Sequence, residues 1–171
     1  VETGDYERVR KMMLASSAIP VAFPPVEIDG VLYADGGVTA NVFVRLDPQS
    51  PAGLIQTWRR THPGERLPKV RFWIILNNQK SQTPSTVQRK WPAILGPSIP
   101  TAIRSATLSE ILWLSAQADF INATMDADIE VRMVSIPESW RVPVQGDFKE
   151  VTMRALSDLG RKMGSDPASW Q

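Results

Sequence analysis

Three prolines and three glycines interrupt the chain between residues 15 and 46, and this run restricts the fold more than any other. Pro20, Pro24 and Pro25 fix φ and remove backbone N–H donors. The residue before each proline is also pushed away from the helical conformation. We therefore expect no helix to cross these prolines.

A β-hairpin is predicted directly after the prolines. Residues 26–28 and 31–33 have the apolar character of two short strands. The dipeptide between them, Asp29-Gly30, is a strong signal for a tight hairpin turn. The hairpin is therefore expected to deliver the residues that follow it to one position on the surface.

An acidic residue and two glycines follow the second strand: Asp35, Gly36 and Gly37. The glycines lack Cβ, so backbone or substrate can approach closely, and they permit φ > 0. Two interpretations of Asp35 are open. It is a turn residue that hydrogen-bonds its own backbone, which is the commoner use of Asp-Gly, or a catalytic carboxylate held in a crevice. These three residues alone favour the turn.

The whole run resembles the patatin-like phospholipase family, whose members carry A-S-x-A-I-P-x-x-F-P-P, a short hairpin and then D-G-G. The matching residues are Ala15-Ser16-Ser17-Ala18-Ile19-Pro20, Phe23-Pro24-Pro25 and Asp35-Gly36-Gly37. In that family the Asp of D-G-G is one half of a Ser–Asp catalytic dyad. The resemblance implies that Asp35 is catalytic, that Gly36 and Gly37 belong to the active-site loop, and that neither a metal nor a cofactor is needed. Ser16 and Ser17 either lie against that site or only cap the preceding helix.

Two positions depart from the family pattern. The chain has Asn41-Val42-Phe43 where many relatives have N-x-P, and Val21 where relatives often place Gly. Both departures affect the shape of the local pocket, and neither affects the carboxylate. They resemble a bacterial branch of the family, which leaves the cell envelope and the cytoplasm open as locations.

The nucleophile of the family is missing from this sequence. The family places its Ser in G-x-S-x-G on a sharp elbow, with a glycine-rich oxyanion loop upstream. Neither Gly96-Pro97-Ser98 nor Gly164-Ser165 continues with the required glycine. We therefore expect residues 1–171 to be the C-terminal part of a single patatin-like domain, without the N-terminal part that carries the nucleophile. The chain alone is expected to be inactive.

The resemblance implies hydrolysis of a lipid acyl ester. Serine would attack the ester carbonyl, Asp35 would accept its proton without a histidine, and water would cleave the acyl-enzyme. The implied partners are a lipid or ester substrate and the missing N-terminal segment, and peripheral contact with a membrane stays open. The alternatives are a non-catalytic binding or structural module with the same fold, and, less in keeping with the match, an unrelated α/β protein.

Composition excludes several other classes of function. The hydrophobic fraction of 43% and the charged fraction of 22% are ordinary for a soluble globular protein. A net charge of +1 gives no electrostatic case for nucleic acid. The absence of Cys rules out disulfides and cysteine nucleophiles, and no apolar run is long enough for a transmembrane helix. The single His, His62, is expected in an exposed loop, which argues against a Ser-His-Asp triad and a zinc site.

The remaining pattern predicts an α/β fold in which helices flank a mostly parallel sheet, and the resemblance implies the C-terminal portion of a three-layer patatin-like fold. The continuous apolar run at residues 70–76 is typical of a central strand buried on both faces. Three prolines and Gly96 argue against one regular helix at residues 91–100. Helices are expected at residues 5–15, 51–61, 101–125 and from Asp147 to about residue 163, and a further strand at residues 129–136.

Overall fold

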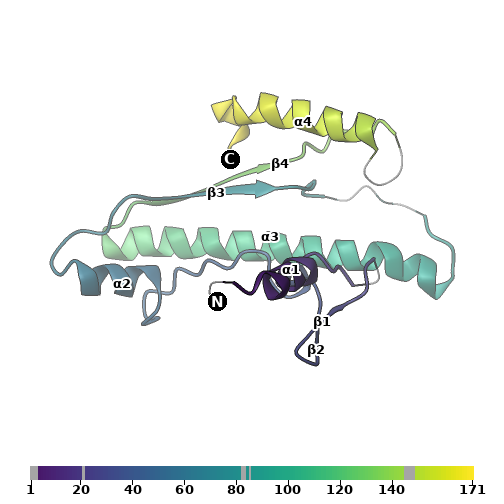
Figure 1. Cartoon of the computed structure of the whole chain (residues 1–171). Coiled ribbons are helices and arrows are strands. Elements are labelled where there is room, and N and C mark those ends of the chain that lie inside the picture. Colours follow the sequence, from purple (N-terminus) through teal and green to yellow (C-terminus); the bar gives the residue numbers. More distant parts are fainter. Residues whose placement is uncertain (1–3, 21, 82–83, 85, 145–148) are drawn as a thin grey trace. The chain divides into compact units, whose positions relative to one another are not determined.

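A computed structural model describes residues 4–20, 22–81, 84, 86–144 and 149–171, which form a mixed α/β chain (Figure 1). The described helices are α1 (Tyr6–Ala15), α2 (Leu54–Thr61), α3 (Trp91–Met125) and α4 (Glu150–Gly164), with 3-10 turns η1 (Gly36–Val38) and η2 (Pro167–Ser169). The strands are β1 (Val26–Ile28), β2 (Val31–Tyr33), β3 (Val70–Leu76) and β4 (Ile129–Ser135). The predicted α/β class is therefore confirmed.

The chain divides into two compact units. The first contains Val1–Val44 and Pro84–Ile111, and the second contains Arg45–Thr83 and Leu112–Gln171. Helix α3 contributes to both units because it extends across residue 111. The expected single domain over residues 1–171 stays a prediction.

The first unit contains the predicted helix and hairpin. Asp5 caps α1, and its Oδ1 accepts the N–H of Arg8 at 2.9 Å. Strands β1 and β2 pair antiparallel around Asp29 and Gly30, whose φ angles of 53° and 78° are those of a tight hairpin turn. Arg8 also forms an ion pair with Asp29 at 2.9 Å. Both elements are therefore where the sequence predicted them.

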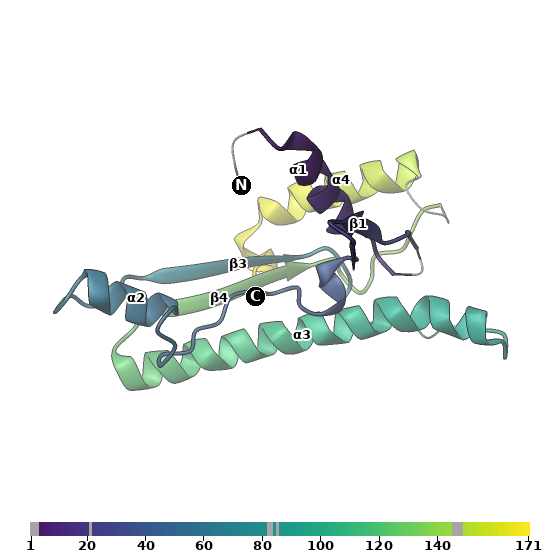
Figure 2. The same cartoon turned by 60° about the horizontal axis from the view of Figure 1, so that its bottom comes forward.

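The second unit is built on a parallel pair of strands. β3 and β4 run in register from Val70 opposite Ile129 to Leu76 opposite Ser135. Within this unit, α4 and the C-terminal part of α3 lie on opposite sides of the two strands (Figures 1 and 2). The best-buried large side chains of the unit are Leu46, Ile55, Leu114 and Ile121. A parallel pair needs a crossover connection, and α3 forms it.

The expectation that β3 is buried on both faces is wrong. Trp73 and Ile75 are 54% and 72% exposed, and exposure alternates along the strand. In the described chain β3 has one strand neighbour, and α4 covers only part of the face that carries these side chains. A continuous apolar run indicates that a segment is apolar enough for a buried strand. It does not show which elements cover each face of that strand.

The expectation that residues 91–100 cannot form one regular helix is also wrong. Helix α3 begins at Trp91 and passes through Pro97 and Pro100. Each proline removes a single N–H donor, and Pro92 lies in the first turn, where that donor has no partner in any case. The hydroxyl of Thr101 donates to the carbonyl oxygen of Pro97 at 2.7 Å, which adds a bond beside the first internal proline.

The predicted start of the second helix needs correction, and the predicted start of the last helix lies outside the described residues. Helix α2 begins at Leu54 because residues 51–53 form a turn, in which the N–H of Gly53 donates to the carbonyl of Ser50. Helix α4 ends at Gly164, with Ser165 as its C-cap. The predicted N-cap Asp147, and Phe148 and Val21, lie outside the described residues.

None of the described helices combines the length and the apolar character needed to cross a membrane.

Candidate functional site

Asp35 lies directly after the hairpin, at the N-cap of η1. Its backbone N–H donates to the carbonyl of Ala18 at 2.9 Å, and Ala18 is buried. This bond brings the Asp-Gly-Gly sequence against the Ala-Ile-Pro part of the run that precedes the hairpin. The Asp35 side chain is partly buried. The two motifs of the run therefore meet at one place in the first unit.

The two carboxylate oxygens of Asp35 have different surroundings. Oδ1 accepts the backbone N–H of Gly37 at 2.7 Å. Within the described part of the chain, Oδ2 has no hydrogen-bond partner. The turn interpretation therefore accounts for Oδ1 only. The same bond fixes the orientation of the carboxylate and leaves its second oxygen able to accept a proton.

The two glycines have different roles. Neither has a positive φ, so the permitted left-handed conformation is not used. A Cβ on Gly37 would lie 2.9 Å from Oδ1 of Asn41 and 3.1 Å from Oδ1 of Asp35. A Cβ on Gly36 would meet nothing within 4 Å. The close approach of the Asn41 and Asp35 side chains therefore requires a glycine at position 37. Position 36 has room for a side chain.

Side chains after the glycines fold back onto the loop. The hydroxyl of Thr39 donates to the carbonyl of Gly36 at 2.8 Å, and Nδ2 of Asn41 donates to the carbonyl of Gly37 at 2.8 Å. In the sequence, Asn41 stands out only as the first residue of Asn41-Val42-Phe43, which departs from N-x-P at its third position. Its position four residues after Gly37 is the signal that predicts such a bond.

Exposed apolar side chains come from the segments that flank Asp35 in sequence. Phe43 is 79% exposed, and the others are Phe23, Val31, Leu32, Tyr33 and Val38. Single exposed apolar residues are normal on a protein surface, whereas a contiguous patch of them marks a binding surface. If these side chains form such a patch on the folded protein, it would suit an apolar substrate or partner.

Ser16 and Ser17 take the capping role. Ser16 is the C-cap of α1, and the hydroxyl of Ser17 donates to the carbonyl of Leu14 at 3.1 Å. This supports the interpretation in which the two serines only cap the preceding helix.

His62 lies at the start of the loop that follows α2, as predicted, but its side chain is not freely exposed. It is the C-cap of α2 and is partly buried. Its ring stacks on Trp58 with centroids 3.7 Å apart, and Nδ1 lies 2.8 Å from the hydroxyl of Thr61. These contacts give His62 a structural role in the second unit. No three His, Cys, Asp or Glu side chains gather as metal ligands within the described ranges.

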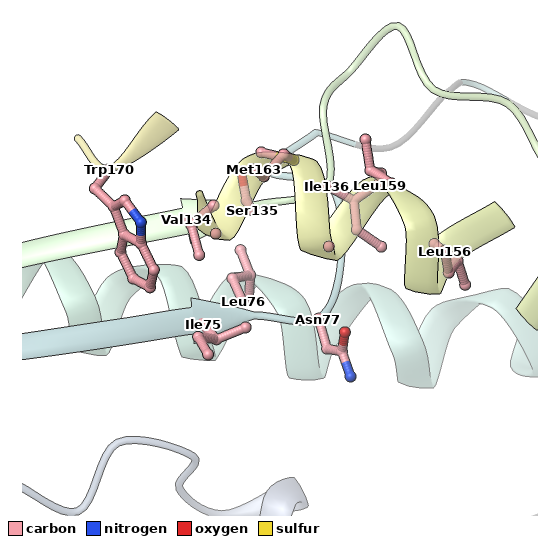
Figure 3. A pocket seen from close by; sticks show the side chains of 12 residues that line it. Ile75, Leu76, Asn77, Val134, Ser135, Ile136, Leu156, Leu159, Met163 and Trp170 are labelled. Carbon is pink, nitrogen blue, oxygen red and sulfur yellow. The ribbon is translucent and has the colours of Figure 1, made fainter. Parts of the chain in front are cut away.

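The second unit has an apolar cavity of about 200 Å³ at the C-terminal ends of β3 and β4 (Figure 3). It is partly open to solvent, and Leu156, Leu159 and Met163 of α4 and Trp170 line one side of it. Asn77 and Ser135 supply the polar side chains of the wall, and none of the lining residues is ionisable. The cavity can accept an apolar group, but it has no acid or base for chemistry.

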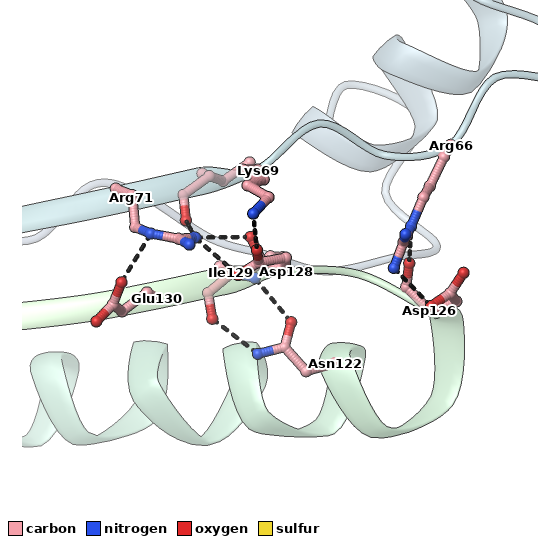
Figure 4. A network of polar contacts seen from close by, with 9 residues as sticks. Arg66, Lys69, Arg71, Asn122, Asp126, Asp128, Ile129 and Glu130 are labelled. Carbon is pink, nitrogen blue, oxygen red and sulfur yellow. Dashed lines mark hydrogen bonds and ion pairs between the residues drawn. The ribbon is translucent and has the colours of Figure 1, made fainter.

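A network of charged side chains lies at the other end of the same strands (Figure 4). Arg71 binds Asp128 at 2.8 Å and Glu130 at 2.7 Å. Asn122 of α3 exchanges two hydrogen bonds with the backbone of Ile129, at 2.7 and 2.8 Å. The hydrogen bond from Arg71 lowers the pKa of Asp128 below its ordinary value of 3.8. These contacts hold β3, β4 and α3 together, and we assign them a structural role.

The Asp128 contact predicts an acid-dependent loss of stability. Because the folded pKa lies below the unfolded one, the stabilisation is complete above 3.8 and is lost as the pH falls through the lower, folded value. Asp128→Asn should therefore destabilise the second unit at neutral pH and reduce its loss of stability in acid. Urea unfolding at about pH 7 and about pH 3 measures both effects. Asp158→Asn, which removes an exposed helix pair with Arg161, is the control, and equal behaviour of the two variants would contradict the prediction.

Comparison with known protein families gives a match at the N-terminal end of the chain. Residues 1–47 match the model of the family described as Patatin-like phospholipase, which confirms the resemblance over this part of the chain. The matched segment contains α1, the hairpin and the whole Asp-Gly-Gly loop. The match covers 47 of the 171 residues and relates this segment to a family whose description names phospholipases. No curated protein and no solved structure matches the chain.

Proposed function

We propose that this chain supplies the carboxylate half of a Ser–Asp dyad in a lipid acyl hydrolase. The observation that carries the proposal is the environment of Asp35. Its Oδ1 is held by the N–H of Gly37, its Oδ2 is unpartnered in the described chain, and it lies in the segment that matches the patatin-like family. A general base needs this combination of fixed orientation and a free acceptor oxygen.

The proposed reaction has two steps. The serine Oγ attacks the ester carbonyl carbon while its proton passes to Oδ2 of Asp35, and the alcohol then leaves with that proton as the C–O bond breaks. Water attacks the acyl-enzyme in the same way, with Asp35 again accepting and returning the proton, and the fatty acid leaves.

The proposed partner is a segment that carries the serine elbow and a glycine-rich oxyanion loop. Residues 1–171 would then be the C-terminal part of one three-layer patatin-like domain, in which helices flank a mostly parallel sheet. The exposed apolar side chains that flank Asp35 in sequence, Phe43 among them, support contact with such a segment or with lipid. We call a polypeptide that joins this segment to residues 1–171 the complete domain.

The alternative is a non-catalytic module of the same fold. The bond from the N–H of Gly37 to Oδ1 of Asp35 favours it, because an ordinary Asp-Gly turn makes the same bond. Ester hydrolysis by the complete domain separates the two proposals. The enzyme proposal predicts turnover that depends on Asp35, whereas the module predicts no turnover, or turnover that Asp35→Asn leaves unchanged.

A further inference from the structure

A single carboxylate on α3 binds the chain that follows the Asp-Gly-Gly loop. Oε2 of Glu110 accepts the backbone N–H of Asn41 and the backbone N–H of Val42, each at 2.9 Å. Glu110 is 69 and 68 residues away from them in sequence and lies in the same compact unit. Hydrogen bonds to an ionised acceptor are stronger than those between neutral groups. The loop is therefore attached to a helix and not only to its own neighbours.

Further hydrogen bonds connect Asn41 to the loop that carries Asp35. Asn41, whose backbone binds Glu110, donates from Nδ2 to the carbonyl of Gly37 at 2.8 Å. Gly37 in turn donates its N–H to Oδ1 of Asp35 at 2.7 Å. A continuous series of hydrogen bonds thus joins the carboxylate of Glu110 to the carboxylate of Asp35. A shift of Asn41 would move Gly37, and with it the orientation of Asp35.

The groups that Glu110 binds argue against a purely electrostatic role, in which its carboxylate would pair with a cation. Among the described residues, no Lys or Arg forms an ion pair with it. Its side chain is partly buried, and one of its oxygens is used on two successive backbone N–H groups. A buried or half-buried carboxylate that binds backbone donors fixes the path of the chain. The path that it fixes here is that of the loop next to Asp35.

We propose that Glu110 is a positioning residue, which holds the Asp-Gly-Gly loop in the conformation in which Asp35 can act as a base. The inference rests on the proposed function of Asp35. Glu110 would touch neither substrate nor nucleophile, and its effect would pass through Asn41 and Gly37. Its loss should therefore disturb the geometry of the reacting groups more than the binding of substrate.

Amide hydrogen exchange of the 171-residue chain tests the anchor without any activity. In Glu110→Ala, exchange at Gly37, Asn41 and Val42 is expected to become about 10- to 100-fold faster, as the loss of bonds to a charged acceptor predicts. Glu110→Gln keeps a neutral acceptor oxygen of the same shape, so its exchange rates should lie between those of the Ala variant and the wild type. Asp119→Asn on the same helix is the matched control, because Asp119 is exposed and makes no hydrogen bond or ion pair within the described chain. Unchanged exchange in Glu110→Ala would overturn the proposal.

Kinetics of the complete domain test the positioning role. Glu110→Ala should lower kcat about tenfold or more with little change in KM, since only the reacting geometry is lost, and Asp119→Asn should leave both unchanged. Faster exchange with unchanged kcat, in a domain that Asp35→Asn inactivates, would overturn the positioning role and leave the proposed function intact. Full turnover by Asp35→Asn would overturn the proposed function itself and the positioning role with it, whatever the exchange rates show.

Discussion

Asp35→Asn in the complete domain is expected to lower kcat for ester hydrolysis by about 10²- to 10⁴-fold, the range that a positioned general base contributes. Asparagine has nearly the same shape, and its side-chain oxygen can still accept the N–H of Gly37 that Oδ1 accepts at 2.7 Å. The loop should therefore stay folded. What is lost is the second oxygen, because an amide nitrogen cannot accept the serine proton. Initial rates on a short-chain ester, together with the unfolding midpoint of each variant, measure the effect.

The chain offers a matched control for this substitution. Asp166 caps η2 as Asp35 caps η1, and its Oδ1 accepts the N–H of Ala168 at 3.0 Å. Asp166→Asn therefore makes the same chemical change at the same kind of turn, and it should leave turnover unchanged. If both variants lost activity to the same small extent, Asp35 would be a turn residue and no more. The pair of variants thus separates the two interpretations of an Asp-Gly turn.

Gly37→Ala is expected to cost about 100-fold in kcat, the usual consequence of a displacement of about 1 Å at a reacting group. The added methyl would lie 2.9 Å from Oδ1 of Asn41 and 3.1 Å from Oδ1 of Asp35. Both contacts involve ends of side chains, which can move aside, so we expect the fold to survive. The movement would displace the Asp35 carboxylate and strain the bond from Asn41 to the carbonyl of Gly37. Steady-state kinetics on the same ester measure the loss.

Gly36→Ala is the comparison for that result. It adds the same methyl one residue earlier, where nothing lies within 4 Å, and its loss of kcat should be far smaller. Equal losses for the two variants would show that general stiffening of the loop, and not the contact at position 37, is responsible. Circular dichroism of both proteins checks that the comparison concerns folded chains.

Local signals in the sequence were sufficient for the part of the fold nearest the candidate site. Asp29-Gly30 predicts the hairpin because a tight turn depends on two adjacent residues, and both have the positive φ that the turn requires. Asp5 predicts the start of α1 for a similar reason. The Asp-Gly-Gly loop was also found by its own three residues and their order after the prolines.

Features that depend on distant parts of the chain were not predictable in this way. Glu110 binds residues 68 and 69 positions away, and a glutamate in a helix carries no local mark of that role. The apolar run of β3 predicted burial on both faces, but the faces depend on which elements cover them, and Trp73 is 54% exposed. Pro97 and Pro100 are helix breakers by local rules, yet α3 continues through both.

A crystal structure of the complete domain is the most direct test of the claim that Asp35 is the base of a Ser–Asp dyad. The distance to measure is that between the serine Oγ of the elbow and Oδ2 of Asp35. We expect it to be about 2.6–3.2 Å, the range over which a proton can be passed directly, with Oδ1 still bound to the N–H of Gly37. A serine oxygen far from Oδ2, or an Oδ2 occupied by another protein group, would contradict the claim.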